Sequence, residues 1–95
     1  MPGAMAEFRR GALGLGPDLA VTLMDVSEDG VCVHLREPVA PGEDAEVMLS
    51  RPLGGKPLKR RATILWCRPA WGRGNLVEVL FARRLSHAEL STLAQ

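Results

Sequence analysis

The chain has 95 residues, 46% of them hydrophobic, and a formal net charge of +1 at pH 7. This length suits one compact domain, and the apolar content excludes a disordered chain. A charge so close to zero gives no general attraction to nucleic acid or to an anionic membrane, and no apolar run approaches the roughly 18 residues that span a bilayer. With no signal peptide in view, we expect a cytoplasmic domain in which Cys32 and Cys67 are reduced thiols.

The first 17 residues, MPGAMAEFRRGALGLGP, combine glycines and prolines with no sustained hydrophobic period. Glycine and proline interrupt regular structure, and chain ends are often poorly ordered unless they are tied down. We therefore expect residues 1–17 to form a flexible N-terminal arm that orders on binding. The adjacent arginines Arg9 and Arg10 lie within this arm.

The part of the chain from residue 19 to residue 82 carries the signals of β-strands separated by turns. Apolar and polar residues alternate, which is typical of strands with one buried and one solvated face. Segments such as PVAPGED and RPLGGKP supply the prolines and glycines of turns. Strands are expected at residues 19–26, 31–37, 45–50, 58–67 and 76–82. In this pattern Trp66 shares a buried face with Ala62 and Ile64, and Met24 is expected in the core.

The hydrophobic period changes in the segment LSHAELSTLA, which predicts a short helix over residues 86–94. Ser86 and Glu89 have the spacing of a capping box, in which each side chain bonds the backbone of the other. Leu85 and Leu90 have the spacing of a hydrophobic staple at the start of the same helix. The helix is expected to pack one apolar face on the rest of the domain.

Five or six short strands followed by one helix predict a mainly β fold. The arrangement that fits best is a small six-stranded antiparallel β-barrel with a C-terminal helix. No βαβ spacing is present, so a parallel sheet is not expected. The chain is accordingly divided into an arm at residues 1–17 and a barrel domain at residues 18–95.

No constellation of residues in the sequence points to catalysis or to metal binding. The two histidines, His34 and His87, have no second ligand at the spacing of a zinc site. Asp25 and Ser27 have no histidine nearby in sequence, and no G-x-S-x-G nucleophile elbow surrounds the serine. We therefore expect a protein that is not an enzyme and that holds no metal and no resident cofactor.

The segment 25–30 reads D-V-S-E-D-G and separates two apolar strand patterns. Asp25, Ser27 and Gly30 occupy the fixed positions of the pattern [D/N]-x-S-x-x-G. Together with the order of the strands and the late pair ATILWC and VEVLF, this makes the chain similar to the PilZ domain family over about residues 19–94. The resemblance implies a six-stranded β-barrel with a C-terminal helix and, as in many members, a site for the bacterial second messenger cyclic di-GMP.

The resemblance also implies roles for the three fixed residues. In the family the aspartate and the serine lie at the barrel rim and hydrogen-bond the ligand, so Asp25 and Ser27 are expected ligand contacts. A carboxylate suits guanine because its two oxygens accept from the N1–H and the amino group together. Gly30 lets the chain turn without a Cβ. The same residue types also build an ordinary tight turn, in which Glu28 and Asp29 are expected to be solvated.

The family's other signature, R-x-x-x-R in the segment before the barrel, is incomplete in this chain. Its arginines grip phosphate and stack on guanine, which suits the planar guanidinium group. Here Arg9 and Arg10 are adjacent, and the positions four residues later hold Leu13 and Gly14. One arginine is expected to contact the ligand, and the second is missing. Two functions therefore stay open: a cyclic di-GMP receptor, and a degenerate PilZ domain that binds a protein partner instead.

The loop RPAWGRG places Trp71 between two arginines, Arg68 and Arg73. An exposed aromatic ring in this setting is a candidate for purine stacking or for docking a partner, and covering the barrel mouth explains it nearly as well. A remote alternative is a barrel that binds nucleic acid through this loop together with Lys59 and Arg61. We expect neither nucleic acid nor a membrane as the partner.

Overall fold

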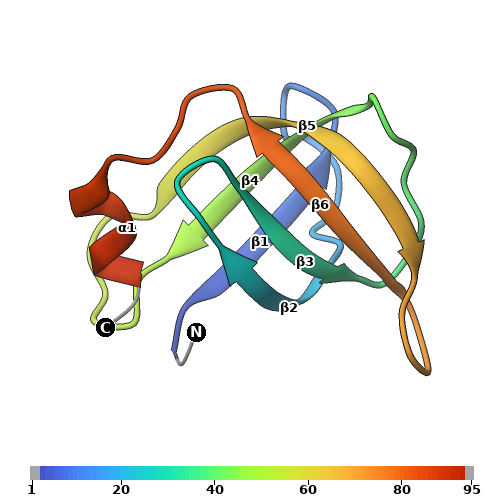
Figure 1. Ribbon diagram of the computed structural model, residues 1–95, viewed down its shortest axis with the longest axis horizontal. Helices are drawn as coiled ribbons and strands as arrows, with labels where there is room; N and C mark the ends of the chain where they lie inside the picture. Colours follow the sequence, from blue (N-terminus) through green and yellow to red (C-terminus); the bar gives the residue numbers. More distant parts are fainter. Residues whose placement is uncertain (1–2, 94–95) are drawn as a thin grey trace.

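The computed structural model describes residues 3–93, which form six strands followed by one helix (Figure 1). The elements are β1 (Met5–Arg10), β2 (Ala20–Val26), β3 (Gly30–Leu35), β4 (Asp44–Ser50), β5 (Leu58–Pro69), β6 (Asn75–Phe81) and α1 (His87–Leu93). All paired strands are antiparallel, and the sheet runs in the order β1-β4-β5-β6-β3-β2. The predicted mainly β fold, a six-stranded antiparallel barrel with a C-terminal helix, is confirmed.

The sheet closes on itself where β1 meets the segment that leads into β2. The amide of Leu19 donates to the carbonyl oxygen of Phe8 at 2.8 Å, and the amide of Phe8 donates to Asp18 Oδ1 at 2.9 Å. These bonds join the two outermost strands of the sheet, so the barrel is nearly closed. Closure leaves fewer unpaired backbone groups on the edge strands, where another chain would otherwise pair.

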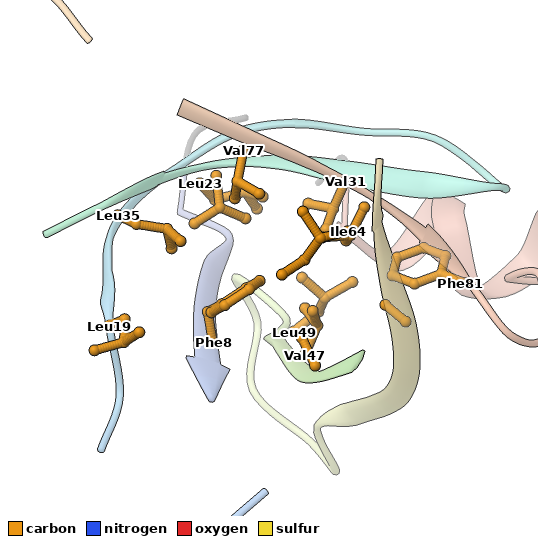
Figure 2. Close-up of a cluster of buried hydrophobic side chains, with 14 of the residues drawn as sticks. Phe8, Leu19, Leu23, Val31, Leu35, Val47, Leu49, Ile64, Val77 and Phe81 are labelled. Carbon is orange, nitrogen blue, oxygen red and sulfur yellow. The ribbon is translucent and has the colours of Figure 1, made fainter. Parts of the chain in front are cut away.

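Inward-facing side chains from all six strands fill the interior of the barrel, as Figure 2 shows for part of the cluster. The predicted alternation is confirmed in β3, β4, β6 and the first part of β5, whose buried apolar residues are Val31, Val33, Leu35, Ala45, Val47, Leu49, Leu58, Ala62, Ile64, Val77, Val79 and Phe81. Each large apolar side chain buried in this way contributes on the order of 1.5–3 kcal/mol. Cys32 and Cys67 are free thiols and are half-buried.

The first strand corrects the expectation of a flexible arm at residues 1–17. Met5–Arg10 form β1 and pair with β4 in a continuous register. Phe8 lies opposite Val47 and is 0% exposed. One large apolar side chain in six residues gives no period, which is why the strand is hard to recognise from the sequence. The first two residues of the chain lie outside the described part.

Two β-bulges correct the expected burial of Met24 and Trp66. The register of β2 against β3 shifts beside Met24, whose side chain is exposed. The register of β5 against β6 shifts between Ile64 and Trp66. Trp66 is half-buried rather than in the core, and the guanidinium of Arg68 stacks 4.2 Å from its ring centroid. A bulge adds one residue to a strand and so breaks the period of two on which the expectation rests.

Helix α1 forms close to the predicted range of 86–94, the last residue of which lies outside the described part of the chain. Leu85, just before the helix, is 2% exposed, and Leu90 packs against the core. This arrangement fits the expected hydrophobic staple. Leu93, in the last turn, is fully buried. The helix therefore rests on the barrel through one apolar face.

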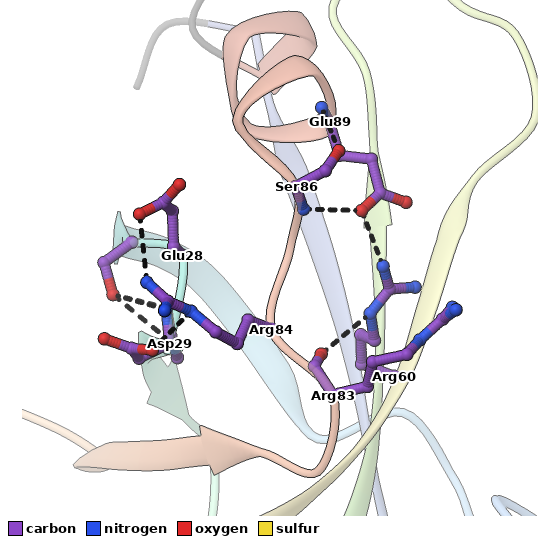
Figure 3. A network of polar contacts seen from close by, with 9 residues as sticks. Glu28, Asp29, Arg60, Arg83, Arg84, Ser86 and Glu89 are labelled. Carbon is purple, nitrogen blue, oxygen red and sulfur yellow. Dashed lines mark hydrogen bonds and ion pairs between the residues drawn. The ribbon is translucent and has the colours of Figure 1, made fainter.

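A buried arginine also fixes α1 to the barrel (Figure 3). The expected capping box is present: the Ser86 amide donates to Glu89 Oε1 at 2.8 Å, and the Glu89 amide donates to Ser86 Oγ at 3.0 Å. Arg60 of β5, only 7% exposed, donates to the same Glu89 oxygen at 2.7 Å and to the carbonyl of Arg83 at 3.0 Å. One carboxylate therefore caps the helix and pairs with a strand.

The antiparallel order gives the barrel two distinct ends. The helix end carries the β2–β3 turn at residues 27–29, the connector at residues 82–86, and α1 (Figure 1). The far end carries the loops at residues 11–19, 36–43 and 70–74. Consecutive loops fall at opposite ends because each antiparallel strand reverses the direction of the chain.

Candidate functional site

The hydrogen bonds of Ser27 build the turn between β2 and β3. Its amide donates to the carbonyl of Gly30 at 2.9 Å, and its hydroxyl oxygen accepts from the amides of Asp29 and Gly30, both at 3.3 Å. The hydroxyl also donates to the Gly30 carbonyl at 3.4 Å. A serine hydroxyl has one donor and two acceptor positions. The side chain of Ser27 is therefore fully engaged inside the turn.

Gly30 is required because two strands approach closely at this point. A Cβ here would overlap the carbonyl oxygen of Val79 in the neighbouring strand β6. The φ angle of Gly30 is not in the left-handed region, so backbone freedom is not the reason for the glycine. Any side chain would push β3 away from β6.

Asp25 is exposed, and its carboxylate takes no part in the hydrogen bonds of the turn. Its Oδ1 accepts from the amide of Val26 at 2.9 Å, and within residues 3–93 no lysine or arginine nitrogen lies within ion-pair distance of its carboxylate. The residue borders a hollow of about 100 Å³ on the outer face of the barrel. We call it the outer hollow; its side-chain lining includes Asp25, Cys32, Leu65, Glu78 and Leu80.

The outer hollow is electronegative. Asp25, Cys32 and Glu78 stand opposite one another in register across β2, β3 and β6. Burial raises the pKa of the Cys32 thiol, and the carboxylates of Glu78 and Asp25 raise it further, while Arg68 offsets part of the effect. These shifts keep the thiol protonated at neutral pH. An anion that entered the hollow would meet two carboxylates.

Glu28 and Asp29 are solvent-accessible, as expected, with side-chain exposures of 37% and 63%, and they also bind Arg84 (Figure 3). Arg84 Nη2 lies 3.2 Å from Glu28 Oε1, and its Nε lies 3.1 Å from Asp29 Oδ1. The amide of Leu85 donates to the Glu28 carbonyl at 2.8 Å, and the amide of Phe81 donates to the Asp29 carbonyl at 2.7 Å. These bonds join the turn to the connector that leads into α1.

The two arginines of the incomplete signature lie on β1 towards the far end. Arg9 forms an ion pair with Glu7 and donates to the carbonyl of Gly16 at 3.2 Å. Arg10 binds Glu43 at 3.0 Å. The hydrogen bond and the opposite charge raise the pKa of Arg10 and lower the pKa of Glu43. Both guanidinium groups are therefore already engaged by groups near the far end.

Trp71 also lies at the far end, at the tip of the β5–β6 hairpin, and has a relative exposure of 101%. The hairpin is ordered, because the Ala70 amide donates to the Gly74 carbonyl at 3.0 Å. The ring nitrogen Nε2 of His34 also lies 2.7 Å from the carbonyl oxygen of Arg73. The indole ring therefore projects into solvent and does not cover the barrel mouth.

The six residues predicted as ligand contacts fall into two sets. The sets are Asp25, Ser27 and Gly30 at the helix end, and Arg9, Arg10 and Trp71 at the far end. Leu19, just before β2, bonds Phe8 of β1 next to the arginines, and Asp25 follows six residues later near the end of β2. At about 3.3 Å per residue this separation is roughly 20 Å along the strand. The structure does not bring the two sets to one pocket.

Four side chains of the outer hollow were not among the predicted contacts: Cys32, Leu65, Glu78 and Leu80. Glu78 faces outward in the alternating pattern of its strand, so correct strand pairing would have placed it beside Asp25. Leu65 belongs to the bulged part of β5, and no periodic pattern indicates where it points. Arg84 is 56 residues from Glu28 in sequence, beyond the reach of any local motif.

Among residues 3–93 there is no group of three or more His, Cys, Asp or Glu side chains that could hold a metal ion. No helix in that part of the chain is long and apolar enough to cross a membrane. The solvent-facing carboxylates of the outer hollow thus stand without a metal-ligand cluster around them.

Comparison with known proteins identifies one family. The family model of the PilZ domain matches residues 11–95, nearly the whole chain. The match includes the D-V-S-E-D-G segment and five of the six strands. No curated protein and no solved structure matches the chain.

Proposed function

The chain belongs to the PilZ domain family, and on this basis we propose that it is a protein-interaction module that does not grip cyclic di-GMP through arginines. The observation that carries the proposal is the separation of Arg9 and Arg10 from the turn that contains Asp25 and Ser27. A nucleotide held by the turn at the helix end would leave both arginines near the opposite end of the barrel.

The charges at the turn support the same proposal. Removing one partner of a buried, hydrogen-bonded charge pair at an interface costs about 2–5 kcal/mol. Arg84 is the arginine bound to this turn, and Glu28 and Asp29 already neutralise it. The carboxylates of Asp25 and Glu78 would repel a phosphate in the outer hollow. A dianionic nucleotide bound at the turn would therefore lack the arginine contacts that the family's R-x-x-x-R signature provides.

The module is proposed to act by binding in the cytoplasm and not by catalysis. A nearly closed barrel with a fixed helix provides a rigid surface, and rigid surfaces lose little conformational entropy when they dock a partner. Ser27 and Gly30 serve the shape of this surface in the proposal. Asp25 is then the residue of the signature whose exposed side chain is not used by the turn and is available for recognition.

Isothermal titration calorimetry with cyclic di-GMP tests the proposal directly. We expect no binding with a Kd below about 10 µM. A matched titration of Asp25→Ala serves as the control for nonspecific heat. Tighter binding by the wild-type protein that disappears in this variant would overturn the proposal.

A cyclic di-GMP receptor is the second candidate, and the exposure of Asp25 favours it. The carboxylate oxygen that does not bond Val26 is open to the N1–H and amino edge of guanine. Under this alternative Asp25→Asn loses affinity, because an amide offers one acceptor in place of two. Arg10→Ala loses affinity as well only if β1 moves towards the helix end, so the two variants separate turn-only binding from arginine-dependent binding.

A further inference from the structure

The outer hollow has an exposed apolar border. Leu65 of β5 and Leu80 of β6 are 47% and 46% exposed, and both line the hollow beside the turn. Leucines on an outer sheet face lose nothing by being covered, and each leucine covered by a partner contributes hydrophobic free energy. The border thus favours contact with another apolar group over contact with water.

The carboxylates of the hollow are only partly balanced by the protein's own cations, because Arg68 offsets part of their effect at Cys32. Asp29 is paired with Arg84 at 3.1 Å. Asp25 and Glu78 have no lysine or arginine partner within ion-pair distance among the residues that the structure describes. Arg68, the nearby cation, stacks on the ring of Trp66. The hollow therefore complements a positive group.

The size of the hollow restricts what that positive group can be. A hollow of about 100 Å³ is on the scale of one side-chain head group. A whole nucleotide does not fit inside it. A lone small cation would fill it but would leave Leu65 and Leu80 exposed.

We infer that the outer hollow is a docking site for a partner protein that inserts a lysine or arginine side chain between Asp25 and Glu78. An adjacent apolar residue of the same partner segment covers Leu65 and Leu80. This inference rests on the proposed function as an interaction module and names its surface and the chemistry of its partner. A basic and apolar segment satisfies the carboxylates and the leucines at the same time.

Trp66 supplies a local reporter for this docking. It lies opposite Glu78 in the β5–β6 register. The chain has two tryptophans, so Trp71→Phe leaves Trp66 as the only one. The probe is a short synthetic peptide of alternating leucine and arginine, and the matched control is the same peptide with glutamate in place of arginine. Binding is followed by Trp66 emission and by amide shifts in a 15N–1H spectrum.

We expect the leucine–arginine peptide to bind and the leucine–glutamate peptide not to bind. The amide shifts should gather at Cys32 and Glu78. Glu78→Gln and Asp25→Asn should each weaken binding about fivefold, as for a partly exposed charge pair. Asp44→Asn, an exposed carboxylate on β4, is the control and should leave the affinity unchanged. Thermal melting confirms that every variant is folded.

Besides an absence of peptide binding, two outcomes would overturn the inference. One is equal binding of the two peptides, and the other is an equal loss of affinity in Asp44→Asn and Glu78→Gln. Adding cyclic di-GMP to the same samples distinguishes a failure of the inferred docking site from a failure of the proposed function. If neither the peptide nor the nucleotide binds, the inferred surface fails while the interaction module stands. If the nucleotide binds tightly, the proposed function itself fails.

Discussion

The two ends of the barrel use their charged residues in different ways. At the helix end, Arg84 and Arg60 each join segments that are distant in sequence, and Arg60 is buried while doing so. At the far end, Arg9 and Arg10 bind carboxylates at partly exposed positions. Trp71 stands there entirely in solvent. The helix end thus contains a buried arginine that joins two segments, whereas the arginines of the far end are partly exposed.

This difference explains how a family signature can persist without its usual partner residues. The turn at residues 27–29 bonds itself through Ser27 and bonds the connector through Glu28 and Asp29. These contacts maintain the turn whether or not a nucleotide binds. The carboxylate of Asp25 is then left to contact whatever partner the outer face receives.

The largest effect is expected from Phe8→Ala, which tests whether β1 is a fixed strand. Phe8 is 0% exposed, and removing a buried phenyl ring should lower the free energy of unfolding by about 4 kcal/mol. Met5→Ala in the same strand is the control, because Met5 is 68% exposed. Urea denaturation measures both variants. A loss below 1 kcal/mol for Phe8→Ala would restore the flexible-arm interpretation.

Removing the Arg60–Glu89 ion pair, which fixes α1 to the barrel, should have the next largest effect. Arg60→Met removes the hydrogen-bond donor to Glu89 and to the Arg83 carbonyl. The loss should lower the free energy of unfolding by about 3 kcal/mol, because the buried methionine side chain cannot replace these bonds. Arg61→Met, on the exposed face of the same strand, should stay within about 0.5 kcal/mol. Chemical denaturation compares them. Equal losses in the two variants would mean that the Arg60 pair does not hold the helix.

Alanine substitutions of one glycine at each end compare how tightly the two ends are packed. Gly30→Ala should cost about 2 kcal/mol, because its Cβ overlaps the Val79 carbonyl and the strands must separate. Gly16→Ala at the far end meets no atom within 4 Å and needs no left-handed backbone, so it should be neutral or slightly stabilising. Thermal melts of both variants check the contrast. A neutral Gly30→Ala would show that β3 and β6 can adjust.

Much of the fold could be predicted from the sequence because its strands alternate. In β3, β4 and β6 every second residue is buried. The capping box of Ser86 and Glu89 predicts where the helix begins. β1 could not be recognised, since Phe8 alone gives no period. Met24 and Trp66 were misplaced by bulges, which depend on pairing with another strand and leave no mark in local sequence.

The candidate site could be predicted only in part, for a related reason. The signature gave the turn, because Asp25, Ser27 and Gly30 are close in sequence. The signature could not predict at which end of the barrel each residue lies, because that depends on the direction of its strand. Arg10 lies fifteen residues before Asp25 and yet near the opposite end of the barrel. Glu78 lies far along the chain and yet across one strand from the turn.

The pH dependence of stability offers a smaller test of the two ends. Hydrogen bonding from the Ser86 backbone and from Arg60 lowers the pKa of Glu89, and Arg10 lowers the pKa of Glu43. A carboxyl pKa that is lower in the folded state stabilises the fold above the unfolded value of about 4.3, and this contribution is lost as the pH falls through the folded pKa.

Glu89→Gln and Glu43→Gln should therefore both flatten the acid limb of a stability–pH curve. The effect of Glu89→Gln should survive in about 1 M salt, because its partner Arg60 is buried. The effect of Glu43→Gln should shrink there, since the exposed pair with Arg10 is screened and only the hydrogen bond from the Ala40 amide remains. Identical salt sensitivity of the two variants would contradict the distinction between the ends.

The smallest effect is expected from Trp71→Ala. The indole ring is fully exposed, so its removal should change the free energy of unfolding by less than about 0.5 kcal/mol. It should also leave the affinity for the leucine–arginine peptide unchanged, because Trp71 lies at the far end and Asp25 at the helix end. A weaker peptide complex in Trp71→Ala, with Glu78→Gln unaffected, would move the docking surface to the far end.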